Sequence, residues 1–519
     1  MSALRRFAAV MVADLRERTR STRFWVILGL MGLLSWLCFP PLASHYVTVN
    51  LGDNARGVYS SAWMGMTLGL MYATTFSLFG FYLVRGTLAR DFDTRVWQLV
   101  VVTPMTRGGY LLAKWASHLA VFSLISAVGI GVALVAQLVR AEDRHVDLIE
   151  LVKPVLLLSL PSLAVTAFFA VLFDLVPWLR RTGGNVLYFF LWICLFTLAV
   201  TLLNPEKVEW MRHSWFSDPN GIAMVTRDLQ SQLASRTPGL DISTLSVGVR
   251  IIDSQPLTFH WLHWQVSPLD VLGRLLWVVV PMALVFTLAP WLDRAAARTS
   301  TSHADRQAGP GRSLRWIEPP LRALQRLPNG ILLAAEMRLV LRQRRFWWWP
   351  LMLGLWIAQA LSPPTVVVVL AIIALVASVD AFARAILRER ETGTGALAIA
   401  AAGAARKIVY ARVGVASLLA VGSVLPGVLH LLAVNSTAAA ALLLVACNVG
   451  IGGLAVGALC QNPRPFELLL LSLAYIGVQA HGPMAVLAYP GWALGVNAIG
   501  LPLLLAVLLL TWPMLVKTR

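Results

Sequence analysis

The stretch DLRERTRSTRFW, residues 14–25, carries spaced arginines and ends in an aromatic pair. It runs directly into an apolar segment, residues 23–45, that is long enough for a helix to cross a bilayer. Upstream, the apolar positions share one helical face: Leu4, Phe7, Met11 and Leu15. This pattern predicts an amphipathic helix on the membrane surface, followed by a membrane-spanning helix.

The same pattern returns 322 positions later as EMRLVLRQRRFW, residues 336–347. Both copies hold an acid, spaced arginines and a Phe-Trp pair, and aromatic residues of this kind favour the headgroup level of a bilayer. The repeated residues are Arg16, Arg20, Arg23, Phe24 and Trp25 in the first copy, and Arg338, Arg342, Arg345, Phe346 and Trp347 in the second. The repeat indicates two related halves, each beginning with an interfacial helix.

The composition excludes an ordinary soluble domain. Of the 519 residues, 58% are hydrophobic and only 13% are charged, whereas soluble domains carry about 25% charged residues. Apolar segments lie near 23–45, 62–84, 110–138, 151–177, 184–203, 269–292, 346–362, 364–384, 408–433, 437–460, 465–481 and 493–515. Since lipid admits only helices or closed barrels, we expect an all-α polytopic membrane protein with about twelve transmembrane helices in two tandem six-helix halves.

The formal net charge of +18 comes from Lys and Arg residues that lie between the apolar segments. Positive residues mark the cytoplasmic side of membrane proteins, so we expect a multi-pass protein of the inner (plasma) membrane with both termini in the cytoplasm. No basic stripe with stacking aromatics points to nucleic acid. The expected partner of this surface is the lipid bilayer.

One segment divides the chain. Residues 293–330 are rich in Ser, Thr, Gly, Pro and Arg, which predicts a flexible cytoplasmic linker between a first half, 1–292, and a second half, 331–519. The long loop 204–268 has balanced charge and is expected outside. Helical spacing within it leaves open a small external domain that gates exit of a substrate or binds a partner.

A second repeated element follows the second apolar segment of each half. Two acids one residue apart precede a threonine, and a basic residue and a tyrosine come before the next apolar segment. Such a short charged helix between two spans is suited to gripping a soluble partner by polar contacts. The candidate contact residues are Asp91, Asp93, Arg107, Glu389, Glu391 and Arg406.

With these elements the chain resembles the permease subunit of ABC-2 type ATP-binding-cassette transporters. That family has six helices, an interfacial elbow helix, and a coupling loop with an acidic-x-acidic-x-Gly-Thr element between helices two and three. The matching residues are Glu389, Glu391, Gly393 and Thr394 in the second half, and Thr103, Pro104, Thr106, Arg107 and Lys114 in the first. The first half lacks the glycine, and Gly403-Ala404-Ala405 replaces the usual Ser/Thr-Pro stretch in the second.

The resemblance implies a complete translocation path in one chain, driven by ATP toward export. No Gly-x-x-x-x-Gly-Lys-Ser/Thr loop is present, so hydrolysis is expected from a separate ATP-binding-cassette ATPase subunit that pushes on the six contact residues. This chain itself is expected to be no enzyme and to need no cofactor. The apolar character favours a hydrophobic or amphiphilic substrate.

Two other functions stay open. A secondary, ion-coupled transporter usually places ionisable residues at the membrane midplane, but Asp174 and Asp380 are expected near cytoplasmic ends, within reach of Arg180 and Arg384. A membrane-embedded enzyme is the other alternative. It rests on the histidine pair His260 and His263 in loop 204–268, which could share a helix face and bind a metal. His213 and Asp253 lie in the same loop. No third ligand is evident and no nucleophile motif is present, so no metal is expected.

Overall fold

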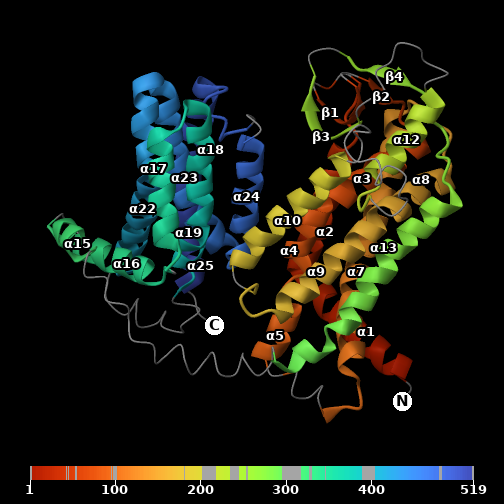
Figure 1. The fold of residues 1–519 in the computed structure, drawn as a ribbon, viewed down its shortest axis with the longest axis horizontal. Coiled ribbons are helices and arrows are strands. Elements are labelled where there is room, and N and C mark those ends of the chain that lie inside the picture. Colours follow the sequence, from red (N-terminus) through yellow and green to blue (C-terminus); the bar gives the residue numbers. More distant parts are fainter. Residues whose placement is uncertain are drawn as a thin grey trace. The chain divides into compact units, whose positions relative to one another are not determined.

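The computed structural model divides into two compact units, Met1–Arg306 and Gln307–Arg519 (Figure 1). The residues that the structure describes are 3–42, 44, 46–52, 55–94, 96, 102–180, 182–201, 218–233, 245–252, 255–294, 317–326, 330–344, 346–388, 404–478 and 482–516. Residues 295–316 lie outside them, so the boundaries of the expected linker stay a prediction.

The first unit is built on a long, mostly buried helical column. Its helices are α1 (Ala3–Thr19), α2 (Thr22–Leu37), α3 (Ser61–Met71), η1 (Tyr72–Phe76), α4 (Ser77–Val84), α5 (Thr87–Asp93), α7 (Arg107–Arg140), α8 (Leu148–Pro154), η2 (Val155–Ser159), α9 (Leu160–Leu175), α10 (Thr182–Thr201), α12 (Ile222–Leu233) and α13 (Pro268–Thr287). The segments α3, η1 and α4 run on as one column, and α8, η2 and α9 form another beside it. The π-helical turns η1 and η2 contact each other.

Glycine allows the two columns to approach closely. A Cβ on Gly65 of α3 would lie 2.3 Å from the carbonyl oxygen of Leu151 in α8, and one on Gly69 would lie 2.9 Å from that of Pro154. Small residues permit such backbone contact between membrane helices. The second expected span is therefore closely packed, and its helical column, Ser61–Phe92, is the most buried of the candidate spans among the described residues.

A four-stranded sheet stands beside α12 at one end of the first unit (Figure 1). Its strands are β1 (Tyr46–Leu51), β2 (Ala55–Gly57), β3 (Leu245–Ile251) and β4 (Leu257–Phe259), in the order β3-β1-β2-β4. β1 pairs antiparallel with β2 and β3, and β2 pairs parallel with β4. The described parts of loop 204–268 therefore share a folded module, here called the sheet module, with residues 46–52 and 55–57, and the sequence pattern did not predict this.

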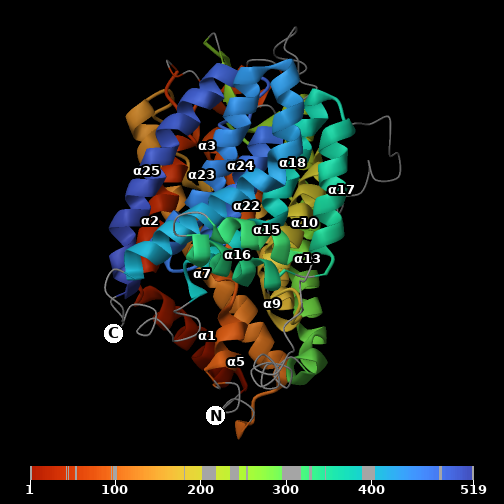
Figure 2. The same cartoon turned by 90° about the vertical axis from the view of Figure 1, so that its left-hand side faces the viewer.

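The second unit contains helices only among its described residues. They are α15 (Glu318–Gln325), α16 (Gly330–Arg342), α17 (Trp348–Leu361), α18 (Pro364–Ala377), α19 (Val379–Ala385), α22 (Ala404–Val434), α23 (Ser436–Cys460), α24 (Arg464–Val478) and α25 (Pro490–Val516) (Figure 2). A large apolar core runs through this unit, formed mainly by α18, α19, α22 and α23, and two smaller apolar clusters lie beside it. The helix α22 packs against α16, α17, α18 and α23.

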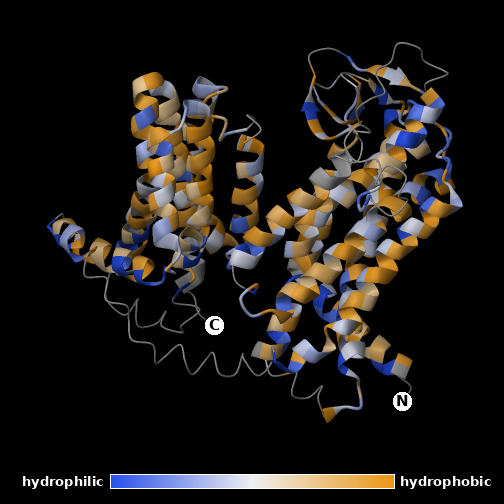
Figure 3. Cartoon of the chain, in the orientation of Figure 1, coloured by the Kyte–Doolittle hydropathy of each residue, from blue (hydrophilic) through white to orange (hydrophobic). Residues whose placement is uncertain are grey.

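The helices are those of a membrane protein, with mostly apolar surfaces (Figure 3). Within the described residues, seven helices are long and apolar enough to cross a membrane, or eight if the bent pair α18 and α19 forms one span. Three shorter apolar helices are Phe24–Leu37, Gly183–Phe196 and Trp348–Leu361. Every expected apolar segment coincides with a helix. The number of twelve spans and the tandem halves stay predictions.

Part of the expected linker is folded. Residues 317–326 include α15, where the sequence analysis expected a flexible segment. Ile317 and Leu321 are buried against Ala334 and Leu341 of α16, and Glu318 is paired with an arginine of the same helix, Arg338, at 2.7 Å. The helix forms because Ile317, Leu321 and Leu324 fall on one helical face.

Candidate functional site

The short helix α5 is anchored at its N-terminus by a carboxylate from α9. The chain turns at Gly86, whose φ of +93° suits glycine. Asp174 Oδ2 accepts the backbone N–H groups of Gly86 at 2.8 Å and Leu88 at 3.2 Å. These donors have no partner within the helix, and Arg85 lies 3.9 Å from the same carboxylate. The first turn of α5 is therefore fixed to the end of α9.

Asp91 fixes the other side of α5 to α7. Its carboxylate lies 2.7 Å from the ammonium of Lys114 and accepts a hydrogen bond from the Tyr110 hydroxyl. Asp91 is only 7% exposed. This burial gives Asp91 an internal role, holding α5 on α7, in place of the expected direct contact with a soluble partner.

The same ammonium reaches the elbow helix α1. Lys114 Nζ lies 3.0 Å from Asp14 Oδ1. The Asp14 carboxylate also pairs with Arg18 at 3.1 Å and accepts a hydrogen bond from the Ser117 hydroxyl. Burial raises the pKa of the Asp14 carboxyl, but the charges of Arg18 and Lys114 and the bond from Ser117 outweigh this and hold the pKa well below its usual range. Asp14 is therefore a buried, ionised carboxylate.

Arg90 completes the connection between α5 and α1. Its guanidinium lies 2.6 Å from Glu17 and 3.9 Å from Asp14. A polar contact on the inner side, between Thr87 Oγ1 and His118 Nε2 at 3.1 Å, links the first turn of α5 to α7. Together these contacts make α1, α5, α7 and α9 one connected polar cluster at a single end of the unit.

A smaller cluster of the same kind exists in the second unit. Glu336 of α16 is 7% exposed, and its carboxylate pairs with Arg388 at 2.8 Å and with Arg412 of α22 at 3.6 Å. Arg412 is one of the largest fully buried side chains. Here too an acid from the elbow helix meets a cation from the long helix that follows the second apolar segment of its half.

The other predicted contact residues lie at the ends of helices. Arg107 begins α7, is exposed, and pairs with Asp293 at 2.8 Å. Arg406 is exposed in the first turn of α22. Asp93 is the last residue of α5, and its side chain lies outside the description. Glu389 and Glu391 lie outside the described residues.

The elbow residues of the two halves differ in their surroundings. Arg16 and Arg20 are exposed, Phe24 is buried, and Trp25 is exposed with its Nε1 donating to the Thr19 carbonyl at 2.8 Å. In the second copy Arg338 pairs with Glu318, while Arg342, Phe346 and Trp347 are exposed. The side chain of Arg23 and all of Arg345 lie outside the description.

Two expected ion pairs have a different geometry. Arg180 Nε donates a hydrogen bond to the backbone carbonyl of Asp174 at 2.5 Å. The Arg180 guanidinium carbon lies over the Phe92 ring, 4.8 Å from its centroid. Asp380 is held by Arg344, 2.5 Å away. An arginine lies near each aspartate, as expected. For Asp380 the contact shown is with Arg344.

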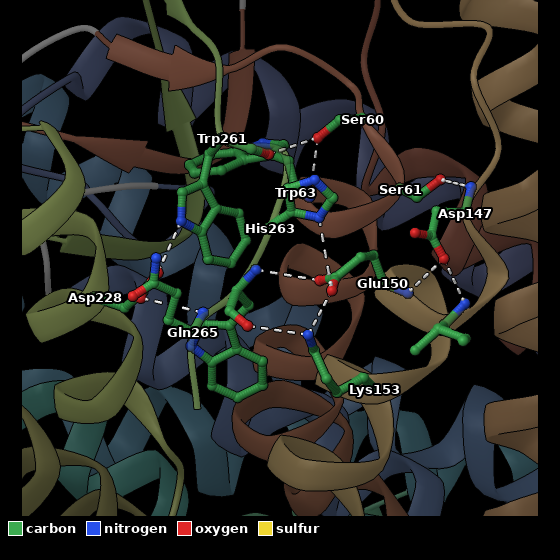
Figure 4. A network of polar contacts seen from close by, with 12 residues as sticks. Ser60, Ser61, Trp63, Asp147, Glu150, Lys153, Asp228, Trp261, His263 and Gln265 are labelled. Atoms are coloured by element: carbon green, nitrogen blue, oxygen red, sulfur yellow. Dashed lines mark hydrogen bonds and ion pairs between the residues drawn. The ribbon is translucent and has the colours of Figure 1, made fainter. Parts of the chain in front are cut away.

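A second polar network lies beside the sheet module (Figure 4). Glu150 of α8 pairs with Lys153 at 2.6 Å and accepts the Trp264 N–H at 3.1 Å. Asp228 of α12 accepts Trp261 Nε1–H at 2.9 Å and the Gln265 N–H at 3.3 Å. The Trp- and His-rich stretch 259–264 is thereby tied to both helices.

Burial raises the pKa of the Asp228 carboxyl, and the hydrogen bonds from Gln232, Trp261 and Gln265 offset only part of this. His263 Nδ1 lies 3.8 Å from Glu150. Among the described residues, no three His, Cys, Asp or Glu side chains are grouped as metal ligands. His213 and Asp253, the other histidine and acid of the alternative metal site, lie outside them.

The sequence analysis quoted the central residues of the first cluster without selecting them as site residues. Asp14 belongs to the repeated elbow motif, and Lys114 to the matching coupling element. The sequence contained a signal for these acids, because both copies of the elbow motif begin with an acidic residue, Asp14 in the first and Glu336 in the second. Comparison with protein-family models, with curated proteins and with solved structures gave no match to this chain.

Proposed function

We propose that this chain is the membrane-spanning permease of an ATP-driven exporter of the ABC-2 type, with two tandem halves that supply the translocation path. A separate ATPase subunit drives it through charged elements on the predicted cytoplasmic side. The proposal draws on the resemblance of the elbow and coupling motifs. The observation that carries it is the attachment of α5, which is held on both sides by buried charges.

The attachment of α5 supports a mechanical role. Asp174 binds the first turn of the helix to α9, and Asp91 binds its last turn to α7 through Lys114. Breaking a buried ion pair leaves a charge without compensation, which costs about 3–5 kcal/mol. A push on α5 is therefore passed to the two membrane helices before the contacts yield. A loosely attached loop would absorb such a push.

Exposed charges next to these helices are the proposed contacts with the ATPase. Arg107 and Arg406 begin the long helices α7 and α22 and have exposed side chains. Asp93, Glu389 and Glu391 remain proposed contacts on the strength of the sequence motif. Asp91 is the internal brace that positions this surface.

The remaining parts of the proposal follow from the resemblance and the composition. A hydrophobic or amphiphilic compound is the proposed substrate, exported from the inner membrane with both termini of the permease in the cytoplasm. The apolar surfaces of the helices support movement of such a compound beside lipid. ATP is bound by the partner subunit.

The test is to tag the chain, extract it in mild detergent from its native host, and identify what is purified with it. A soluble ATPase is expected, and Arg406→Glu should weaken its retention by about a hundredfold or more, since like charges brought together at an interface cost several kcal/mol and each 1.4 kcal/mol is about tenfold. Arg144→Glu is the matched control, because Arg144 is exposed on the opposite predicted side. Recovery of the permease alone under several gentle extractions would refute the proposal and favour proton-coupled transport, measurable in vesicles.

A further inference from the structure

We infer that Asp14 and Glu336 are the centres of two equivalent latches, each of which holds an elbow helix onto the long helix of its own half. Each acid lies between two cations, one from that long helix and one from the segment after the second apolar segment. The latches themselves follow from the geometry alone. Their role in transport rests on the proposed function.

In the first half the two cations from outside α1 are Lys114 of α7, 3.0 Å from Asp14, and Arg90 of α5, 3.9 Å from it. Arg18, which also pairs with Asp14 at 3.1 Å, belongs to α1 itself and does not join it to another helix. Asp14 is 4% exposed and Lys114 is also 4% exposed. Arg90 is partly exposed and binds Glu17 of α1 as well, at 2.6 Å. Both cations therefore fasten α1, at two neighbouring turns of that helix.

In the second half the cations are Arg388, 2.8 Å from Glu336, and Arg412 of α22, 3.6 Å from it. Glu336 stands in the repeat where Asp14 stands in the first copy. Arg412 follows Arg388 by the same number of positions, 24, as separates Lys114 from Arg90. All three members of the latch thus occupy matching places in the two halves.

Two of the three side chains have changed while the charges have not. Aspartate and lysine in the first latch correspond to glutamate and arginine in the second, and the third member is arginine in both. Ion pairs in buried positions do little for stability compared with apolar packing, so packing alone does not require a charged triad at matching places twice. A role that needs charge, and a defined position of the elbow helix, explains why both halves have it.

The first latch extends further than the second. Lys114 is shared between Asp14 and Asp91, which lies 2.7 Å away on α5. Movement of α5 therefore reaches the elbow helix through this shared ammonium group, as well as directly through Arg90. This makes Lys114 a positioning residue that links the proposed coupling helix to α1.

The latches can be tested by hydrogen–deuterium exchange of the purified full-length chain in lipid nanodiscs. In Asp14→Asn, the amides of α1 should exchange at least about tenfold faster, because the helix opens locally once its buried cations are unpaired. In Glu336→Gln the same increase should appear in α16. Each effect should stay within its own half, and Asp14→Glu and Glu336→Asp should largely keep the protection.

Two acids elsewhere are matched controls, one half-buried and one buried. Glu142→Gln removes the partner of Arg56 in the first unit, and Glu467→Gln alters a fully buried acid of α24 in the second. Neither should accelerate α1 or α16 selectively. Unchanged exchange of α1 in Asp14→Asn, or equal acceleration of α1 in Glu142→Gln, would overturn the latch.

A milder variant guards against misfolding. Arg90 is partly exposed, so Arg90→Gln should fold and accelerate exchange in α1 by about threefold, in keeping with a partly solvated pair. If Asp14→Asn aggregates and Arg90→Gln leaves hydrogen exchange in α1 unchanged, the latch is also overturned.

The outcome is separable from that of the proposed function. Faster exchange without any ATPase partner would leave the latches standing and remove the exporter proposal. If an ATPase partner is found but exchange in the variants is unchanged, the exporter proposal stands and the latches are ruled out. If both hold, Lys114→Met should abolish the stimulation of ATP hydrolysis by the permease while the ATPase stays bound, whereas Lys114→Arg should restore part of it.

Discussion

Arg56 and Glu142 form a two-point ion pair, with guanidinium–carboxylate distances of 2.6 and 3.0 Å. Arg56 comes from strand β2, and Glu142 follows the end of α7. The same carboxylate accepts the backbone N–H of Tyr59 at 3.1 Å. Through this pair the sheet module is fixed to the end of α7, so we expect the two to move as one body.

Removing this pair should destabilise the first unit. Arg56 has a side chain that is only 2% exposed, so Glu142→Gln leaves a buried positive charge and should cost about 3 kcal/mol. Thermal unfolding in detergent measures this. As a control, Asp293→Asn breaks the exposed pair with Arg107 and should cost under about 1 kcal/mol. Similar losses in both variants would contradict the buried role of the pair.

Close packing of the helical columns gives a second prediction. Gly65→Ala places a Cβ 2.3 Å from the Leu151 carbonyl, so α3 and α8 must move apart, at a cost of about 2 kcal/mol. Gly131→Ala is the matched control within α7, since no atom lies within 4 Å of its Cβ. It should be neutral or stabilise by up to about 1 kcal/mol. A melting temperature unaffected by Gly65→Ala would exclude this contact.

The polar network around Asp228 predicts a pH dependence. The pKa of Asp228 is raised by burial above its ordinary value of 3.8. A raised pKa in the folded state means that Asp228 stabilises the fold fully below pH 3.8 and that this contribution is lost as the pH rises through the raised value. Asp228→Asn lacks that term. The melting temperature of the wild-type chain should therefore fall relative to the variant over this interval; parallel pH profiles would contradict the shift.

The predicted orientation can be checked with single cysteines. In a background without Cys38, Cys194, Cys447 and Cys460, a cysteine at Arg144 should react with a membrane-impermeant maleimide on intact cells with a permeable outer layer. A cysteine at Arg406 should react only after the membrane is opened. Both positions are exposed, so access and not burial decides the result. Reversed labelling would place the basic side outside.

Much of the helical fold could be predicted from the sequence, because a helix is a local structure. Its hydrogen bonds join residues four positions apart, so the length and apolarity of each segment were enough to place it. The repeated elbow motif could be recognised for the same reason. The helix α15 was missed because its short apolar face is surrounded by Pro and Arg residues typical of a linker.

The partners across the fold were settled only by the tertiary structure. Strand β1 pairs with β3, about 200 positions away, with Tyr46 opposite Ile251, and no local pattern encodes that register. Asp91 was selected as a contact residue, yet packing buries it against Lys114. Asp14 and Lys114 are 100 positions apart, and each alone reads as an ordinary charge near a membrane surface. Asp14 and Lys114 come together only because α1 packs on α7. The same packing buries both side chains, so their charges form one connected site.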